Sequence, residues 1–237
     1  MRRVLLAGLL LLALALGAGS GYYAGDYLDT PEPTASGTAG PLGEISPSPT
    51  PSPTEPSTPV KTPIPNNEEP LEPGLDYTER SFSVQTKDGQ TVRLSLEVPQ
   101  GWRLTRDTKR PDQVRYVEKV EQRGVRVQAD QPAEGTPADE MAQLIVDLKK
   151  SQAPENDVRV LDHTSEVITG DDGESRTVST LVYTYIPGET LWYVIVRWIA
   201  INGENTNIEM SVTGLPQDAD ALKEILDKAS TSVNETG

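Results

Sequence analysis

The sequence predicts an α+β domain, an antiparallel β-sheet flanked by α-helices, that follows an N-terminal apolar helix and a disordered proline-rich linker. Three observations carry this prediction. Segments of alternating polar and apolar residues recur in pairs around short turn sequences, as consecutive antiparallel hairpins require. Two other segments place apolar residues at helical spacing. The N-terminal third instead combines one apolar run with a stretch rich in proline, serine and threonine.

Residues 1–25 are predicted to direct the chain out of the cytoplasm. Arg2 and Arg3 precede 22 uncharged residues, Val4–Gly25, and positive flanks stay on the cytoplasmic side. As a helix this run is about 33 Å long, enough for a bilayer core. Its most apolar part, Val4–Leu16, has the length of a cleaved signal peptide. We favour an uncleaved single-pass anchor in the cell membrane, and cleavage would give a secreted protein instead.

Residues 26–77 are predicted to be a disordered acidic linker. Thirteen of the 20 prolines lie between Pro31 and Pro73, many of them alternating with serine or threonine. Proline removes backbone donors and favours polyproline II, so this stretch cannot build a core. We expect it to hold a folded domain, residues 78–233, clear of the membrane. Residues 234–237 are expected to be a loose C-terminus.

The first half of the domain is predicted to contain four strands and a helix. RSFSVQT and TVRLSLEV alternate around the turn Asp88-Gly89. QVRYVEK and GVRVQA follow the turn Pro99-Gln100-Gly101-Trp102. A helix then begins at Thr136-Pro137, with proline at its first position and Asp139 three residues after the capping threonine. Its apolar stripe consists of Met141, Leu144, Ile145 and Leu148.

The second half repeats this order. VRVLDHTSEVIT and RTVSTLVYTYI form a hairpin around Asp171-Asp172-Gly173, and LWYVIVRWIAI and TNIEMSVT form another around Asn202-Gly203. A last helix begins near Pro216–Asp220 and has its apolar stripe at Leu222, Ile225, Leu226 and Ala229. Consecutive hairpins give an antiparallel sheet, which excludes a doubly wound parallel fold.

This order of elements, opened by a strand and the turn Pro99-Gln100-Gly101-Trp102, resembles the PsbP-like fold. That fold is shared by an extrinsic photosystem II subunit, a Ran-binding import factor and the LpqN-like lipoproteins of bacterial envelopes. The lipoproteins are the most similar, because they also have an export signal, a low-complexity spacer and a terminal domain. The chain lacks their lipid-modified cysteine, so anchoring falls to the N-terminal helix. The resemblance implies a non-catalytic binding or accessory module.

Composition argues against several chemistries. The net charge of −15 repels nucleic acid, so no nucleic-acid partner is expected. The absence of cysteine excludes disulfides and thiolate nucleophiles. The single histidine, His163, is expected to be exposed on a strand, which argues against a catalytic triad and a zinc site. The acidic turn Gly170–Glu174 lacks the length of an EF-hand loop. We therefore predict no catalytic residue, no metal and no cofactor.

One basic segment interrupts the acidic domain. Arg103–Arg126 contains eight basic and four acidic residues. Either these side chains form an ordinary solvated strand face, or they bind an anionic cell-wall polymer or an acidic envelope protein.

LWYVIVRWIAI, residues 191–201, is the most apolar stretch of the domain and is too short to span a bilayer as a helix. Both of its faces are apolar, so we expect a central strand covered on each side by one helix. Its arginine, Arg197, then needs a partner. A two-residue turn at Asn202-Gly203 would place Arg197 opposite Ile208, with Met210 and Val212 on the same face. A three-residue turn would place it opposite Glu209 and move all three apolar residues to the tryptophan face.

We favour the Arg197–Glu209 ion pair, because it leaves no unpaired charge in the core. The alternative is a binding pocket in which Arg197 acts with Trp198, Tyr183 or Tyr185. The expected function is an extracytoplasmic binding or accessory module of a bacterial envelope, without catalysis. A wall-associated structural protein and a hydrolase that uses two carboxylates are the alternatives.

Overall fold

The computed structural model describes residues 59–129, 133–201 and 203–236, and Val60 begins one compact unit. The α+β class is confirmed, because antiparallel sheets are combined with two α-helices. The expected apolar helix at 1–25 and the linker up to Thr58 lie outside the described residues. Within the described ranges, no helix is both long and apolar enough to cross a membrane.

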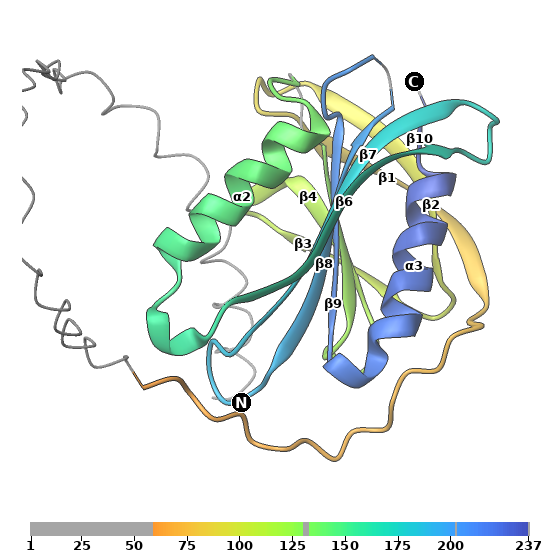
Figure 1. Ribbon diagram of the computed structural model, residues 1–237. Helices are drawn as coiled ribbons and strands as arrows, with labels where there is room; N and C mark the ends of the chain where they lie inside the picture. Colours follow the sequence, from red (N-terminus) through yellow and green to blue (C-terminus); the bar gives the residue numbers. More distant parts are fainter. Residues whose placement is uncertain (1–58, 130–132, 202, 237) are drawn as a thin grey trace, which may run out of the picture. The chain divides into compact units, whose positions relative to one another are not determined.

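Two sheets and two helices make up the domain (Figure 1). One sheet has the order β1-β2-β10, and the other has the order β3-β4-β5-β9-β8-β7-β6. The strands are β1 (Tyr77–Gln85), β2 (Thr91–Pro99), β3 (Arg103–Asp107), β4 (Arg110–Val117), β5 (Gly124–Ala129), β6 (Arg159–Thr169), β7 (Ser175–Tyr185), β8 (Trp192–Ala200), β9 (Ile208–Gly214) and β10 (Asn234–Glu235). The helices are α2 (Pro137–Ser151) and α3 (Ala219–Ser232), with short 3₁₀ turns η1 (Pro154–Asn156) and η2 (Pro216–Asp218).

The helices begin where the sequence predicts. Thr136 caps α2 through a capping box with Asp139, and Met141 and Leu148 are the buried residues of the predicted stripe. On α3 the whole predicted stripe is buried, since Leu222, Ile225, Leu226 and Ala229 are all 0% exposed.

Two strands were not predicted. β3 has no apolar alternation, and its pairing with β4 holds it in the sheet. β10 pairs with β2, opposite Ser95 and Leu94, so the expected loose C-terminus is wrong at residues 234 and 235. The reason is the same in both cases: a neighbouring strand supplies the hydrogen bonds that local sequence cannot indicate.

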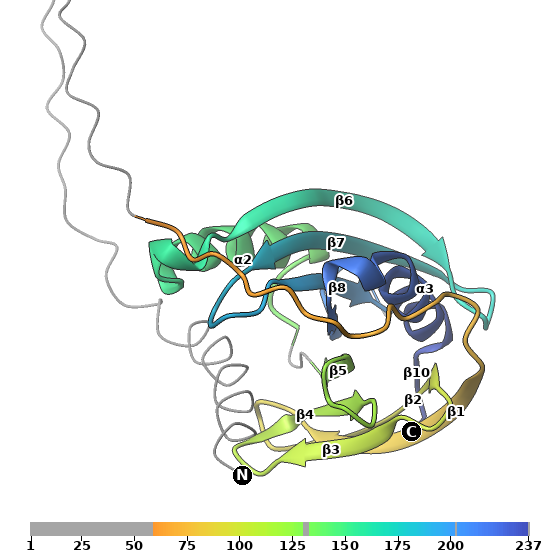
Figure 2. The same ribbon diagram turned by 90° about the horizontal axis from the view of Figure 1, so that it is seen from below.

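The main core lies between the two sheets. Helix α3 contacts β2 on one side and β8 and β9 on the other, as Figure 2 also shows. Helix α2 packs on β7 and β8 from the opposite side of the large sheet (Figure 1). We call the α3 side of this sheet its inner face and the α2 side its outer face. Strand β8 is interior and covered by one helix on each side, as predicted from its two apolar faces.

Residues 60–76, which the sequence assigned to the linker, lie on the domain as an extended strap. The Lys61 ammonium donates to Asn156 at 2.5 Å and to the Pro187 carbonyl at 2.7 Å. Leu71 and Leu75 pack against the core. The domain therefore begins near residue 60 and not at 78, because a segment without a core of its own can still dock through its backbone and two leucines.

A buried ion pair fastens this strap. Asp218 is 0% exposed and accepts hydrogen bonds from Arg123 Nε at 2.7 Å and Nη2 at 2.9 Å. It also accepts the backbone N–H groups of Leu71 at 2.8 Å and Leu215 at 3.0 Å. Burial raises the pKa of the Asp218 carboxyl, but these hydrogen bonds outweigh it and hold the pKa below its usual value. Arg123 also donates to the Glu69 carbonyl at 2.6 Å, so the pair joins the strap to the start of α3.

Candidate functional site

Arg197 lies on the inner face and is part of the protein's framework. The residue is 5% exposed, and its guanidinium makes three side-chain contacts. It donates to Thr180 Oγ1 at 2.9 Å, Asp227 Oδ1 at 2.9 Å and Ser230 Oγ at 2.7 Å. Because Asp227 and Ser230 belong to α3, Arg197 ties β8 to that helix.

The predicted Arg197–Glu209 pair is wrong. Arg197 lies opposite Met210, and Glu209 lies opposite Trp198 on the outer face. The pairing ends at Ile199–Ile208, so the connection is longer than either predicted turn. Asn207 closes it, donating its backbone N–H to the Ile199 carbonyl and accepting from the Ile201 N–H, both at 2.9 Å. The observed β8–β9 register is shifted by two residues from the register that a two-residue turn would give. A shift of two residues leaves each side chain on the face that this alternative predicted.

The other three predicted binding residues lie on the opposite face of the sheet from Arg197. Trp198, Tyr183 and Tyr185 are on the outer face and only 2–3% exposed. The two tyrosine rings are 5.8 Å apart and tilted by 49°. Burial raises the pKa of Tyr183, and it raises the pKa of Tyr185 to about 12, so both hydroxyls stay protonated at neutral pH. Neither hydroxyl hydrogen-bonds to a residue that the structure describes. The predicted pocket is thus divided by the sheet.

The outer face joins these aromatic residues to the basic segment seen in the sequence. Its side chains come from five neighbouring strands: Gln113 and Arg115 of β4, Arg126 and Gln128 of β5, Glu209 and Ser211 of β9, Trp198 of β8, and Tyr183 and Tyr185 of β7. Helix α2 covers the β6–β8 end of this face. Figure 2 shows α2 beside β6 and β7, with β3 and β4 at the far end of the sheet.

Arg126 is the best-bonded side chain of the outer face. Its Nε donates to Ser211 at 3.0 Å, and its Nη1 donates to Gln128 at 2.9 Å and Gln113 at 3.3 Å. Its Nη2 forms an ion pair with Glu209. This network spans three strands, so Arg126 and Glu209 stabilise the face that carries them.

Two arginines at the border of the outer face also have carboxylate partners. Arg110 pairs with Asp112 at 3.0 Å and reaches Gln128 at 3.2 Å. Arg103 pairs with Glu121, and both side chains are more than half exposed.

Arg115 differs from all of these. It lies directly opposite Arg126 in the β4–β5 ladder and is half-buried. Its carbonyl accepts from Thr105 Oγ1 at 3.2 Å, but its guanidinium forms no hydrogen bond or ion pair with any residue that the structure describes. Burial and the charge of Arg126 lower the pKa of Arg115, while Glu121 and Tyr185 act in the opposite direction. Like charges on directly opposite residues destabilise a sheet, and Glu121 offsets this repulsion without forming an ion pair with Arg115.

The Arg115 guanidinium packs against Gly124. A Cβ there would lie 3.7 Å from Arg115 Nη2 and only 3.1 Å from the Tyr116 carbonyl, so this position is already closely packed. Gln122, two residues before Gly124, has a buried side-chain oxygen without a hydrogen-bond partner among the described residues. A buried acceptor without a donor costs free energy.

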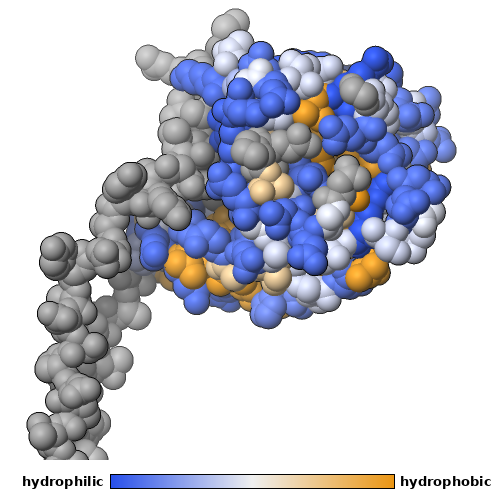
Figure 3. Space-filling model, turned by 90° about the horizontal axis from the view of Figure 1, so that it is seen from above, coloured by the Kyte–Doolittle hydropathy of each residue, from blue (hydrophilic) through white to orange (hydrophobic). Residues whose placement is uncertain are grey.

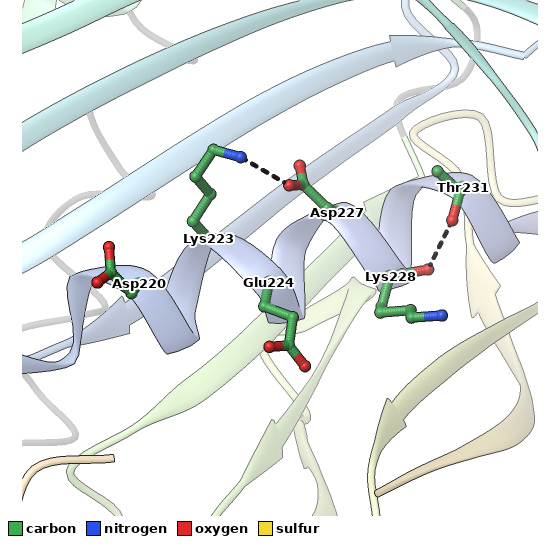
Figure 4. A pocket seen from close by; sticks show the side chains of 6 residues that line it. All are labelled: Asp220, Lys223, Glu224, Asp227, Lys228 and Thr231. Carbon is green, nitrogen blue, oxygen red and sulfur yellow. Dashed lines mark hydrogen bonds and ion pairs between the residues drawn. The ribbon is translucent and has the colours of Figure 1, made fainter. Parts of the chain in front are cut away.

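Other surface features have ordinary explanations. A shallow depression on α3 is lined by Asp220, Lys223, Glu224, Asp227, Lys228 and Thr231 (Figure 4). Three of its charged residues have partners: Lys223 pairs with Asp227 at 3.0 Å, and Glu224 accepts from Gly74 of the strap at 2.7 Å. His163 is exposed on β6, as predicted. No group of three or more histidine or acidic residues that could hold a metal occurs in the described part of the chain.

The surface drawn in Figure 3 is mainly hydrophilic, and its hydrophobic residues form small scattered patches. The face drawn in Figure 3 therefore presents polar groups, and no broad apolar area, to a partner.

Comparison with known proteins gives only distant structural similarity. The sequence matches no family model and no curated protein. Solved structures that match this chain include LpqN of Mycobacterium tuberculosis, described as involved in cell envelope biogenesis. The match has 14% sequence identity and a TM-score of 0.40, and it covers 67% of this chain and 92% of LpqN.

Sequence reasoning identified the basic segment Arg103–Arg126 but not the residue within it that stands apart. Arg115 and Arg126 are eleven positions apart in the chain, and only the register of the β4–β5 hairpin places them opposite each other. A count of charges shows an excess of arginine, whereas the structure shows which arginine lacks a partner among the described residues.

Proposed function

We propose that this chain is a non-catalytic binding module of a bacterial cell envelope, held outside the cytoplasm by its N-terminal segment, and that its ligand docks on the outer face. The observation that carries the proposal is Arg115, a half-buried guanidinium opposite Arg126 without a partner among the described residues. The arginine-flanked apolar run Val4–Gly25 and the sequence resemblance to envelope lipoproteins support the location.

The surroundings of the outer face favour binding over hydrolysis. Glu209, its central carboxylate, is ion-paired with Arg126, and Asp112 is ion-paired with Arg110. A general acid requires a carboxyl group in apolar surroundings, whereas each of these two carboxylates lies against an arginine. The buried tyrosines and the arginines supply recognition groups rather than a proton donor and acceptor pair.

Photo-crosslinking in intact cells tests the docking face. A photoreactive residue replaces Arg103, which is exposed beside the outer face, or Lys223, which is exposed on α3. We expect adducts with an envelope component from position 103 alone, and we expect Arg115→Glu to abolish them. Equal adducts from both positions, or adducts that survive Arg115→Glu, would contradict the proposed face.

Protease added to intact cells tests the location. The domain should be digested, because the proposal places it outside the cytoplasm. Full protection of the domain until the cells are lysed would place it inside and overturn this part of the proposal.

A further inference from the structure

We propose that Arg115 anchors a site for a single oxyanion, a carboxylate or a phosphate group, on the outer face; this inference rests on the proposed function and names the chemistry of its ligand. The distribution of charge supports this assignment. Arg103, Arg110 and Arg126 each have a carboxylate partner, and Arg115 has none among the described residues. An oxyanion bound to Arg115 would supply the partner that its guanidinium lacks among the described residues and relieve the repulsion between Arg115 and Arg126.

The same count limits the size of the anionic part. Three of these four arginines already have a carboxylate, so Arg115 is the one of the four whose charge lacks an ion-pair partner among the described residues. A long polyanion would have to displace Glu121, Asp112 and Glu209 from their arginines. One carboxylate or phosphate group fits without breaking any of these ion pairs.

A second donor lies beside Arg115. The guanidinium packs against the backbone at Gly124, where a Cβ would lie 3.7 Å from Arg115 Nη2. Tyr185 lies near enough to Arg115 to affect its pKa. The protonated hydroxyl of Tyr185 is a hydrogen-bond donor. A planar guanidinium and a phenol O–H are donors suited to the two or three oxygens of such a group.

Thermal unfolding of the full-length protein tests the site, with inorganic phosphate and acetate as the probes and chloride as the reference at equal ionic strength. The variant is Arg115→Gln. The matched control is Arg106→Gln, because Arg106 is an exposed arginine of β3 that donates to the Ser83 carbonyl, away from the outer face. We expect phosphate, acetate or both to raise the Tm of the wild type and of Arg106→Gln by roughly 3 °C or more at concentrations well above Kd. Arg115→Gln should show no such rise.

The probes distinguish the two sources of the oxyanion. A rise with phosphate alone identifies a phosphate group, and a rise with acetate alone identifies a carboxylate. No rise with either probe, or an equal loss of the rise in both variants, would overturn the site. So would a Tm of Arg115→Gln in chloride well below that of the wild type, because Arg115 would then be a structural residue. If the anions have no effect while crosslinks from position 103 persist, the anion site fails and the binding module stands.

Discussion

Arg197 and Arg115 lie on opposite faces of the same sheet and have opposite surroundings. Arg197 is almost fully buried, and Thr180, Asp227 and Ser230 all accept its hydrogen bonds. Arg115 is half-buried and faces another arginine. A buried charge must be compensated inside the fold, whereas a charge within reach of solvent can remain available to a ligand. The structural arginine, Arg197, therefore lies in the more hydrophobic surroundings, and Arg115, the candidate for ligand binding, lies on the more polar face.

The inner-face pair Arg123–Asp218 should show the largest cost of breaking a compensated charge. Asp218→Asn removes the carboxylate that four N–H groups share and leaves Arg123 buried without its main partner. We expect a loss of about 3 kcal/mol in the free energy of unfolding, measured with urea at pH 7. Asp220→Asn, on the first turn of α3, is the control and should change stability by less than about 1 kcal/mol. Equal losses in the two variants would contradict the role of the pair.

The same pair predicts a dependence on pH. The pKa of Asp218 is lower in the folded protein than in the unfolded chain. Its contribution is therefore present above the unfolded pKa of about 4 and is lost as the pH falls through the lower folded value. In urea unfolding at a series of pH values, the stability difference between wild type and Asp218→Asn should narrow below pH about 4. A difference that is constant or grows on acidification would mean that another group is responsible.

Arg197→Leu should have a smaller cost, since Asp227 is partly exposed and can be hydrated when its partner is lost. We expect about 2 kcal/mol, mainly because buried Ser230 and Thr180 lose a donor. Arg103→Leu is the control on the solvent-exposed side and should cost less than about 1 kcal/mol. In a double-mutant cycle, Arg197→Leu and Asp227→Ala should be non-additive, and strict additivity would contradict their ion pair.

Arg115→Gln should have the smallest effect and the opposite sign. Removing a like charge opposite Arg126 should leave the free energy of unfolding unchanged or raise it by a few tenths of a kcal/mol. Arg126→Gln, which removes the partner of Glu209, should instead destabilise by about 1 kcal/mol. Urea unfolding of both variants in chloride measures the contrast. A clear loss of stability in Arg115→Gln would mean that the two arginines do not differ as inferred.

Much of the fold could be predicted because the deciding patterns are local. Alternation at period two located eight of the ten strands, and the helical stripes located both helices. The two apolar faces of LWYVIVRWIAI correctly predicted a strand between two helices. β3 and the strap at 60–76 could not be predicted, because β3 depends on pairing with β4 and the strap on contacts with Asn156, Asp218 and Glu224 far along the chain.

The sequence by itself determined the class of the fold, the order of its main elements and the need of Arg197 for a partner. Tertiary structure decided which residue is that partner. The candidate Glu209 was chosen from the adjacent strand, but Asp227 comes from a helix 30 positions beyond Arg197, and a long connection set the register that sends Glu209 to Arg126. Tertiary structure alone also left Arg115 opposite a like charge. Alternation fixes the face on which a side chain lies, because it depends only on neighbours in the chain, whereas the charges that meet on that face depend on distant segments that folding brings together.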